Sequence, residues 1–411
     1  MKINKWTLGL AAVGLVSLPS WVQAEEKPNN LLTSLSSTTI SGYVNTTMSW
    51  RPGTSATAIP GRAFDGPASK QDGFNLDVVS LTIAKPLDED QWSAGYTAQL
   101  WMGPDAVGFN LGPGATASDF AVKQAYVELR APIGNGLNFK IGHFNYIGGY
   151  EMPDAGDNPN YSRSYAWTLE PASHTGLLAN YKVNETLAVA AGVANTYNNG
   201  VNGRAARFTG APGGAPTESE KTYMAAFYLT APESFGWLKG ATLASTVVNG
   251  LNNASGSAGS TLTTGHITCW QIGGTMPTPV KNLTVGASYD YMDSPNLPFA
   301  AAPNKSAYAN AVTLYSTCQA TDKLKLNARA EYTSATSGFW YAQAAGAAPH
   351  GSELLGVTGT VDYSLWKNVM SRLEVRWDHS LTGDRPYGGR GGAVGGEKNA
   401  TTVVANIIYK F

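Results

Sequence analysis

The chain has 411 residues, and only 14% of them are charged, against 46 Gly, 20 Tyr and 11 Trp. Charged residues make up about a quarter of an ordinary soluble domain, so this composition argues against one. With 28 basic and 29 acidic residues there is no positive excess, which argues against nucleic acid as a partner. No apolar stretch beyond the N-terminus approaches the ~20 residues of a membrane-spanning helix, so helical spans are excluded too.

Residues 1–24 have the pattern of a secretory signal peptide. Lys2 and Lys5 form a basic start, an apolar run covers residues 8–18, and small residues occupy positions 22 and 24 before a cleavage point. We expect residues 1–24 to be removed after export. Residues 25–37 would then form a short periplasmic segment ahead of the first strand. The alternative is a permanent N-terminal anchor.

Segments of alternating polarity recur from residue 38 to the end of the chain. A period of two places alternate side chains on opposite faces of a β-strand. Leu326, Ala328 and Ala330, for example, alternate with Arg329 and Glu331. The segments predict about sixteen strands, with approximate bounds 38–50, 74–85, 91–102, 120–131, 136–147, 172–182, 185–195, 219–231, 236–250, 262–276, 281–292, 308–320, 323–334, 353–366, 368–380 and 400–411.

The connections between these strands alternate strictly between short and long. Short turns on the periplasmic side and long outer loops are typical of a transmembrane barrel. Because each unpaired backbone group in lipid costs several kcal/mol, such strands must close on themselves. The sequence therefore predicts an all-β fold, a transmembrane antiparallel up-and-down β-barrel over residues 38–411. The predicted long loops are 51–73, 103–119, 148–171, 196–218, 251–261, 293–307, 335–352 and 381–399.

The polarity of each strand also predicts which face meets lipid. A charge on the lipid face near the membrane centre costs about 2–4 kcal/mol, so the charged parity must face the lumen. Aromatic residues near the strand ends are expected to form two girdles at the membrane surfaces. They are Trp92, Trp237, Trp366 and Phe411 near short turns, and Trp50, Trp101 and Trp377 near long loops.

The last predicted strand ends the chain on an aromatic residue. Ile407, Tyr409 and Phe411 lie on one apolar parity. This pattern is similar to the terminal strand of bacterial outer-membrane barrels, which implies that these three residues form the signal read by the barrel-assembly machinery. The alternative is the last strand of a soluble sheet that happens to end in Phe. Val404 and Ile408 fall on the lumen-facing parity, where the sequence offers no reason for apolar residues.

One polar segment carries a family resemblance. The run from Asn158 to Tyr165, followed by Glu170-Pro171 and His174-Thr175-Gly176, resembles a segment of the OmpL-like β-barrel porins. The preceding strand at 120–130 and the turn at 134–137 are similar to the same family, and the strong match covers roughly residues 120–182. The resemblance implies a porin in the outer membrane of a Gram-negative bacterium. It does not bring a substrate or a set of pore residues.

The third outer loop, 148–171, is the predicted constriction. By analogy with sixteen-stranded general porins, we expect it to fold into the barrel. Opposed charges across the narrowed lumen would filter ions. Arg163 would pair with Asp157 or Glu170 and shape the loop. The alternative is a solvated outer loop, with lumen charges paired only to neighbours such as Glu331 and Glu374. The acidic candidates are Glu151, Asp154, Asp157 and Glu170, and the basic ones are Arg130, Lys140, Lys325, Arg329, Arg372 and Arg376.

The predicted function is a water-filled channel for passive diffusion of small hydrophilic solutes and ions. One alternative is a substrate-specific channel, for example for sugars, with Tyr161, Tyr165 and Trp167 as an aromatic ladder. Another is a non-conducting adhesin or structural barrel. Catalysis is not expected, because His174 near Ser162 lacks a nucleophile elbow. No metal spacing or cofactor motif is found. Similarity to general porins implies a homotrimer.

Overall fold

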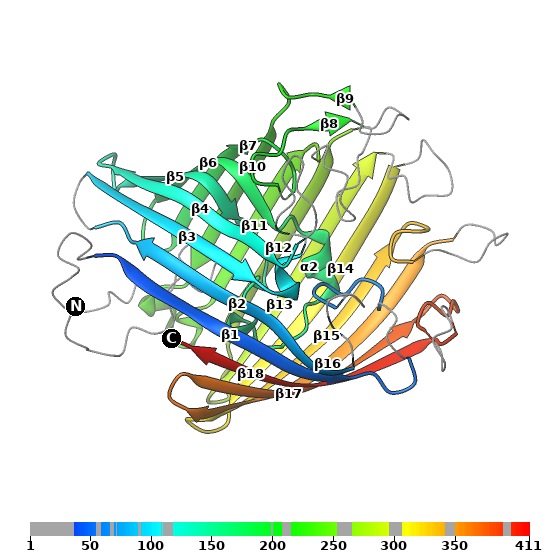
Figure 1. Ribbon diagram of the computed structural model, residues 1–411. Coiled ribbons are helices and arrows are strands. Elements are labelled where there is room, and N and C mark those ends of the chain that lie inside the picture. The colour runs from blue at the N-terminus through cyan, green and yellow to red at the C-terminus, as the bar shows by residue number, and fades with distance from the viewer. Residues whose placement is uncertain are drawn as a thin grey trace.

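Sixteen strands form one closed antiparallel barrel in the computed structural model of the chain (Figure 1). The structure describes residues 37–54, 59–65, 70, 72–88, 92–107, 109, 118–198, 200–207, 215–252, 265–295, 306–341, 350–388 and 396–411. The expected signal peptide and nearly all of the expected periplasmic segment fall outside these ranges. Within them, no helix is long and apolar enough to cross a membrane.

Each barrel strand pairs with its neighbours along the chain, and the first strand pairs with the last. This β1–β18 seam runs from Tyr43 opposite Lys410 to Trp50 opposite Val403. The predicted sixteen-stranded barrel is confirmed. Its strands are β1 (Thr39–Trp50), β2 (Gly73–Lys85), β3 (Ser93–Met102), β4 (Phe120–Ala131), β5 (Leu137–Asn145), β6 (Ser173–Lys182), β7 (Leu187–Ala194), β10 (Thr222–Thr230), β11 (Thr242–Gly250), β12 (Ile267–Pro277), β13 (Leu283–Pro295), β14 (Ser306–Gln319), β15 (Leu324–Ala335), β16 (Ser352–Trp366), β17 (Val369–Ser380) and β18 (Asn399–Lys410).

The structure corrects the sequence-based bounds in one region. The predicted strand 236–250 begins only at Thr242, because residues 233–238 form the 3-10 helix η4 (Glu233–Leu238). Gly236 within it has φ 59, a left-handed conformation that cannot continue a strand. The connection 231–241 is therefore longer than predicted, but it is still shorter than the connections on either side of it, 195–221 and 251–266, so short and long connections still alternate. A small hairpin, β8 (Ala206–Arg207) with β9 (Ala215–Pro216), lies between β7 and β10.

Polarity is reversed relative to a soluble protein. On β15, Leu326 and Tyr332 are exposed on the outside, whereas Arg329 and Glu331 are buried inside. This is the arrangement required by the cost of a charge in lipid. Trp101 departs from the expected girdle. It points inward, on the same parity of β3 as the buried Gln99, and packs against Phe109.

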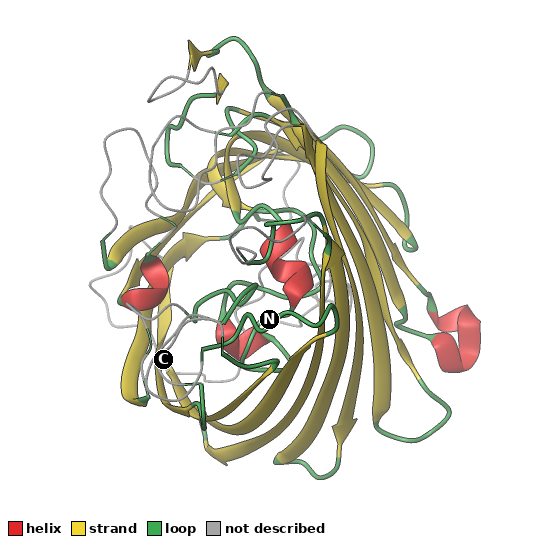
Figure 2. Cartoon of the chain, turned by 90° about the vertical axis from the view of Figure 1, so that its right-hand side faces the viewer, coloured by secondary structure: helices red, strands yellow, loops and turns green. Residues whose placement is uncertain are grey.

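The barrel interior is occupied by chain segments that enter from the outer loops (Figure 2). Part of the inner wall is apolar and receives the start of loop 3, defined here as residues 146–172 between β5 and β6. Met224, Tyr228 and Val248 pack there against Phe144 and Ile147. The Tyr228 hydroxyl also donates a hydrogen bond to the Ile147 carbonyl. The entry angle of loop 3 is thereby fixed before its polar part begins.

Candidate pore constriction

Loop 3 has a fixed conformation of its own. The Asn158 side chain donates to the carbonyls of Met152 and Asp154 at 2.8 and 3.1 Å and accepts from the Met152 amide at 2.7 Å. Ser164 caps the short helix α2 (Tyr165–Leu169) by accepting from the Trp167 amide at 3.3 Å. These local side chain to backbone bonds are typical of Asn and Ser in turns and at helix starts. They shape the loop that meets the barrel wall.

Strand β17 offers the loop a ladder of charges. Every second residue faces inward, and these residues are Arg372, Glu374, Arg376 and Asp378. Arginines can only donate and carboxylates only accept, so the strand presents alternating donors and acceptors. The backbone of an extended loop carries the complementary groups. Such a ladder can bind a segment without fixing its side chains.

The ladder and the loop backbone meet in order. Arg372 donates to the carbonyls of Ala155 and Asn158, both at 2.6 Å. Glu374 accepts from the amides of Tyr161 and Ser162 at 2.6 and 3.0 Å. At one end of the same row, Arg376 donates to the Arg163 carbonyl, and Asp378 accepts from the Tyr165 hydroxyl at 2.7 Å. Loop 3 is thus bonded to β17 along its length.

Arg329 on β15 is the most heavily bonded group of this contact. Its guanidinium lies 2.9 Å from Glu151 of loop 3 and 3.2 Å from Glu331 of its own strand. It also donates to the carbonyls of Ser162 and Arg163. Its side chain has no solvent exposure. A buried charge is tolerated only when it is paired and hydrogen-bonded. The Arg329 guanidinium therefore requires loop 3 as a partner, and loop 3 is held in place by Arg329.

The tip of loop 3 lies across the β1–β18 seam. Asp154 accepts from the Tyr43 hydroxyl of β1 at 2.9 Å and from Gln99 of β3 at 3.1 Å. Burial raises the pKa of the Asp154 carboxyl, and the charge of the nearby Asp157 raises it further. Asp157 itself lies 3.2 Å from Lys410 at the end of β18. Contacts from both sides of the seam therefore hold the tip.

The same contact explains the two apolar residues on the lumen face of the last strand. Val404 and Ile408 are buried in one cluster with Ala155 of the loop tip. Gly156 lies beside them, since a Cβ there would be 3.4 Å from the Ile408 side chain and 3.1 Å from that of Lys410. These apolar positions of β18 are a docking surface for the loop.

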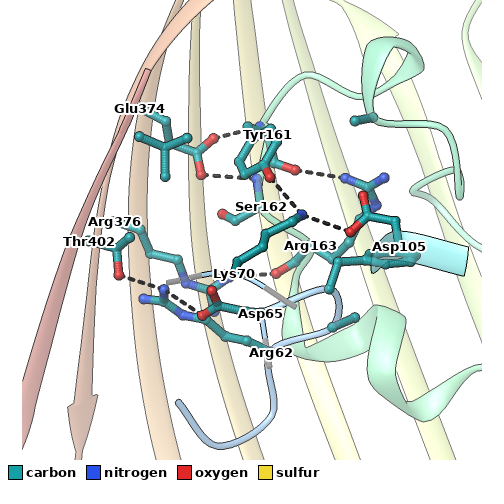
Figure 3. Close-up of a pocket in the computed structure, with 14 residues that line it drawn as sticks. Arg62, Asp65, Lys70, Asp105, Tyr161, Ser162, Arg163, Glu374, Arg376 and Thr402 are labelled. Carbon is teal, nitrogen blue, oxygen red and sulfur yellow. Dashed lines mark hydrogen bonds and ion pairs between the residues drawn. The ribbon is translucent and has the colours of Figure 1, made fainter. Parts of the chain in front are cut away.

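Residues of loop 1 and of the segment after β3 lie beside loop 3 (Figure 3). In loop 1 (residues 51–72), Arg62 forms an ion pair with Asp378 of β17. Lys70 lies 2.9 Å from Asp105 of the 3-10 helix η2 (Pro104–Ala106) and donates to the Tyr161 hydroxyl at 2.7 Å. The cavity between these loops measures about 30 Å³. That is room for one or two waters, so it is not the route of a solute.

The arginines assigned to the constriction have a different role from the predicted one. Arg329, Arg372 and Arg376 do not face the acidic loop across a gap. They contact the loop directly, and their side chains are at most 1% exposed. The prediction of an electric field across open water between these arginines and the acidic loop is therefore wrong. The predicted alternative, in which the lumen charges pair only with neighbours such as Glu331 and Glu374, does not describe these arginines either, because they also bond to loop 3.

Arg163 pairs with neither Asp157 nor Glu170, contrary to the expectation. Its guanidinium donates to the carbonyls of Tyr161 and Pro153. It also lies over the rings of Phe64 and Trp167 at 5.3 and 5.7 Å. Loop 1 and the helix α2 supply these rings, so the residue joins two loops.

The remaining predicted basic residues lie near the periplasmic turns. Lys140 on β5 lies 3.6 Å from Glu128 on β4. Arg130 donates to the Asn135 carbonyl in the turn that follows its strand. Lys325 is half-buried opposite Asp362. Within the described part of the chain, none of these three residues bonds to loop 3.

Comparison with known families identifies the chain. The family profile described as "Putative beta-barrel porin-2, OmpL-like" matches residues 37–411. The chain belongs to this porin family. It is accordingly a channel protein of the bacterial outer membrane. No curated protein has a detectably similar sequence.

Solved porin structures share the fold of this porin. The anion-selective porin from Comamonas acidovorans superposes with a TM-score of 0.58 at 11% identity, covering 91% of this chain and 99% of that one. The outer-membrane channel DcaP of Acinetobacter baumannii gives 0.55 at 13%, covering 91% and 97%. The trimer form of OmpT of Vibrio cholerae gives 0.52 at 13%, covering 91% and 99%. At these identities the similarity concerns the fold alone.

Sequence reasoning missed the acceptor half of the contact. Glu331, Glu374 and Asp378 each accept a hydrogen bond from loop 3 in this porin, as the arginines donate to it. The signal was present on β17, where arginine and carboxylate alternate on the inward parity. A strand with alternating positive and negative side chains can bind a backbone segment, whereas a row of side chains that all carry the same charge would bind ions. Loop 1 gave no comparable signal, because Arg51 and Arg62 are isolated in it.

The base of loop 3 contains a buried carboxyl pair. Glu170 lies close enough to Asp290 of β13 for the two carboxyl groups to interact electrostatically, and both are buried. Burial raises the pKa of Glu170 well above its ordinary value, and the charge of Asp290 raises it further. Gly149, at φ 90, lies against the pair, where a Cβ would be 2.5 Å from Glu170 Oε2. The other titratable groups around Glu170 are Glu151, Cys269, Tyr146 and Tyr197.

This pair predicts a pH response of the loop. A raised carboxyl pKa gives stability that is complete below the ordinary pKa of Glu and is lost as the pH rises through the folded-state pKa. We expect alkaline pH to loosen the base of loop 3 and to increase conductance and current noise. Single-channel recordings across pH test this. Glu170→Gln, which cannot ionise, should flatten the profile, and an unchanged profile in that variant would contradict the assignment.

Proposed function

We propose that the protein is a size-limited diffusion pore for small hydrophilic solutes and ions, with loop 3 as its constriction. One observation carries the proposal. The polar inner wall binds the loop backbone through β15 and β17, as in Arg372 with Ala155 and Glu374 with Tyr161. A sixteen-stranded barrel has an aqueous lumen. A segment bonded inside such a lumen reduces its cross-section in a fixed way.

Planar bilayer recording of the refolded mature chain tests the proposal. We expect stepwise conductance that is ohmic at moderate voltage, because a bonded loop leaves a permanent opening. Liposome swelling with solutes of increasing size should show a cut-off below that of a barrel without an inserted loop. Membranes that contain folded barrels but show no conductance steps would refute the pore. They would favour the alternative of a surface adhesin or structural barrel.

A sugar-specific channel is the less favoured alternative. It requires aromatic rings exposed along the path, but Tyr165 is fully buried and Tyr161 is 9% exposed. Their hydroxyls bond to Asp378 and Asp77. Trp167 alone of the three keeps partial exposure. The burial and bonding of these aromatic residues therefore favour a role in packing the loop, and they do not favour a path for sugars.

The proposed partners follow from the same architecture. The apolar outer face is proposed to contact outer-membrane lipid, and Phe411, Tyr409 and Ile407 to be read by the barrel-assembly machinery. Export by a cleavable signal peptide at 1–24 is proposed from the sequence. A homotrimer is proposed because structural relatives include a trimeric form. No cofactor or metal is assigned.

A further inference from the structure

We infer that ion selectivity is set by the pair Asp157 and Lys410, which joins the tip of loop 3 to the last strand. It is not set by the arginine wall, the name used here for Arg329, Arg372 and Arg376 together. The inference rests on the proposed pore. It assigns the specificity-determining role to Lys410 of β18 together with Asp157.

The charges that bind loop 3 are sealed from the solution. The side chains of Arg329, Arg376 and Glu331 are 1% exposed or less, and they are paired with one another. Arg372 is equally buried against Asp362. Ions passing through water do not approach these groups, and each positive charge has a negative charge within 3.2 Å. At longer range such pairs cancel, so they act weakly on a permeating ion.

Asp157 and Lys410 are in the opposite situation. Their side chains are 49% and 21% exposed, although both lie on the inner side of the barrel. Their charges are 3.2 Å apart. Lys410 is the last residue of β18, next to the carboxyl terminus, so the pair joins loop 3 to the end of that strand. A solvated charge within the ~10 Å screening length of the path acts directly on passing ions.

Glu128 and Lys140 form a second exposed pair on β4 and β5, with side chains 20% and 16% exposed. This pair lies towards the periplasmic end, since the strands lead to the turn at 132–136. It belongs to the barrel wall alone, however. The pair at the loop tip differs because one partner is carried by the constriction, so it lies where the lumen is narrowest in the proposed pore.

Charge exchange within the pair tests the inference by reversal potentials in a salt gradient. Asp157→Lys leaves two positive charges and should shift selectivity towards anions. Lys410→Glu leaves two negative charges and should shift it towards cations. A unit charge ~5 Å from an ion in water changes its local concentration about 4-fold, so we expect a change of that size or larger in the cation-to-anion permeability ratio. The double exchange Asp157→Lys with Lys410→Glu should return the ratio to the wild-type value.

Asp322→Lys is the matched control. It makes the same charge change at an exposed residue of the turn between β14 and β15. We expect it to shift the ratio much less than Asp157→Lys. Heat-modifiable gel mobility establishes that each variant is folded. If Lys410→Glu does not assemble, Asp157→Lys and Asp157→Asn still carry the test, with the charge-neutral variant giving half the shift.

The two proposals fail in distinguishable ways. If Asp157→Lys forms conducting channels whose reversal potential equals that of the wild type, this inference is overturned and the proposed pore stands. Equal shifts in Asp157→Lys and Asp322→Lys would also overturn it, because the effect would then be a general surface charge. A wild-type protein without conductance would overturn the proposed pore itself.

Discussion

Replacement of Arg329 by alanine is expected to release loop 3 from the barrel wall and to increase single-channel conductance. The variant loses the bonds to Glu151 and to the carbonyls of Ser162 and Arg163. It also leaves Glu151 and Glu331 as buried carboxylates without this partner. Breaking a buried ion pair by removing one member costs about 3–5 kcal/mol. A loop held by such contacts should then occupy undocked states for much of the time.

Conductance histograms and limited proteolysis of loop 3 measure this release. Lys325→Ala is the matched control, since it removes a basic inward residue from the same strand that makes no bond to loop 3 in the described structure. Arg329→Lys should be intermediate, because an ammonium group keeps the charge but cannot bond in the planar geometry of a guanidinium. Wild-type conductance and protease resistance in Arg329→Ala would show that the loop does not depend on this contact.

Deletion of Phe411 is expected to impair assembly of the barrel while leaving the conductance of each inserted channel unchanged. The Phe411 amide donates to the Gly42 carbonyl and its carbonyl accepts from the Gly42 amide, both at 3.0 Å. These bonds extend the β1–β18 seam by one residue. The ring also covers Gly42, where a Cβ would be 2.7 Å from the ring. Loop 3 bonds to other residues, so the constriction should be unaffected.

The amount of heat-modifiable barrel in outer-membrane fractions measures the assembly defect. Phe411→Tyr is the control, because it keeps an aromatic ring and both backbone bonds. It should assemble at nearly wild-type levels. A deletion variant inserted at the wild-type level would refute the assembly role of the terminal residue. Reduced conductance per channel in that variant would indicate instead that the seam supports the constriction.

The sequence by itself determined the barrel. Alternation with period two is a local property, and the cost of charge in lipid converts it into an inside and an outside. The inward positions of Arg329, Arg372 and Arg376 therefore followed from neighbouring residues alone. The closing strand followed in the same way from Ile407, Tyr409 and Phe411. The sequence predicts that the strand ending at Gly250 begins at residue 236 and not at Thr242, because no local pattern marks the left-handed conformation of Gly236.

Only the tertiary structure decided which inward charges meet water. Glu151 and Arg329 are 178 residues apart, and Asp157 and Lys410 are 253 apart. The alternation of polarity along a strand predicts which face of the barrel a residue lies on, but not which loop packs against that face. Loop 3 covers the arginine wall and leaves Asp157 and Lys410 exposed. The candidate site thus depends on contacts between distant segments, and such contacts leave no local pattern in the chain.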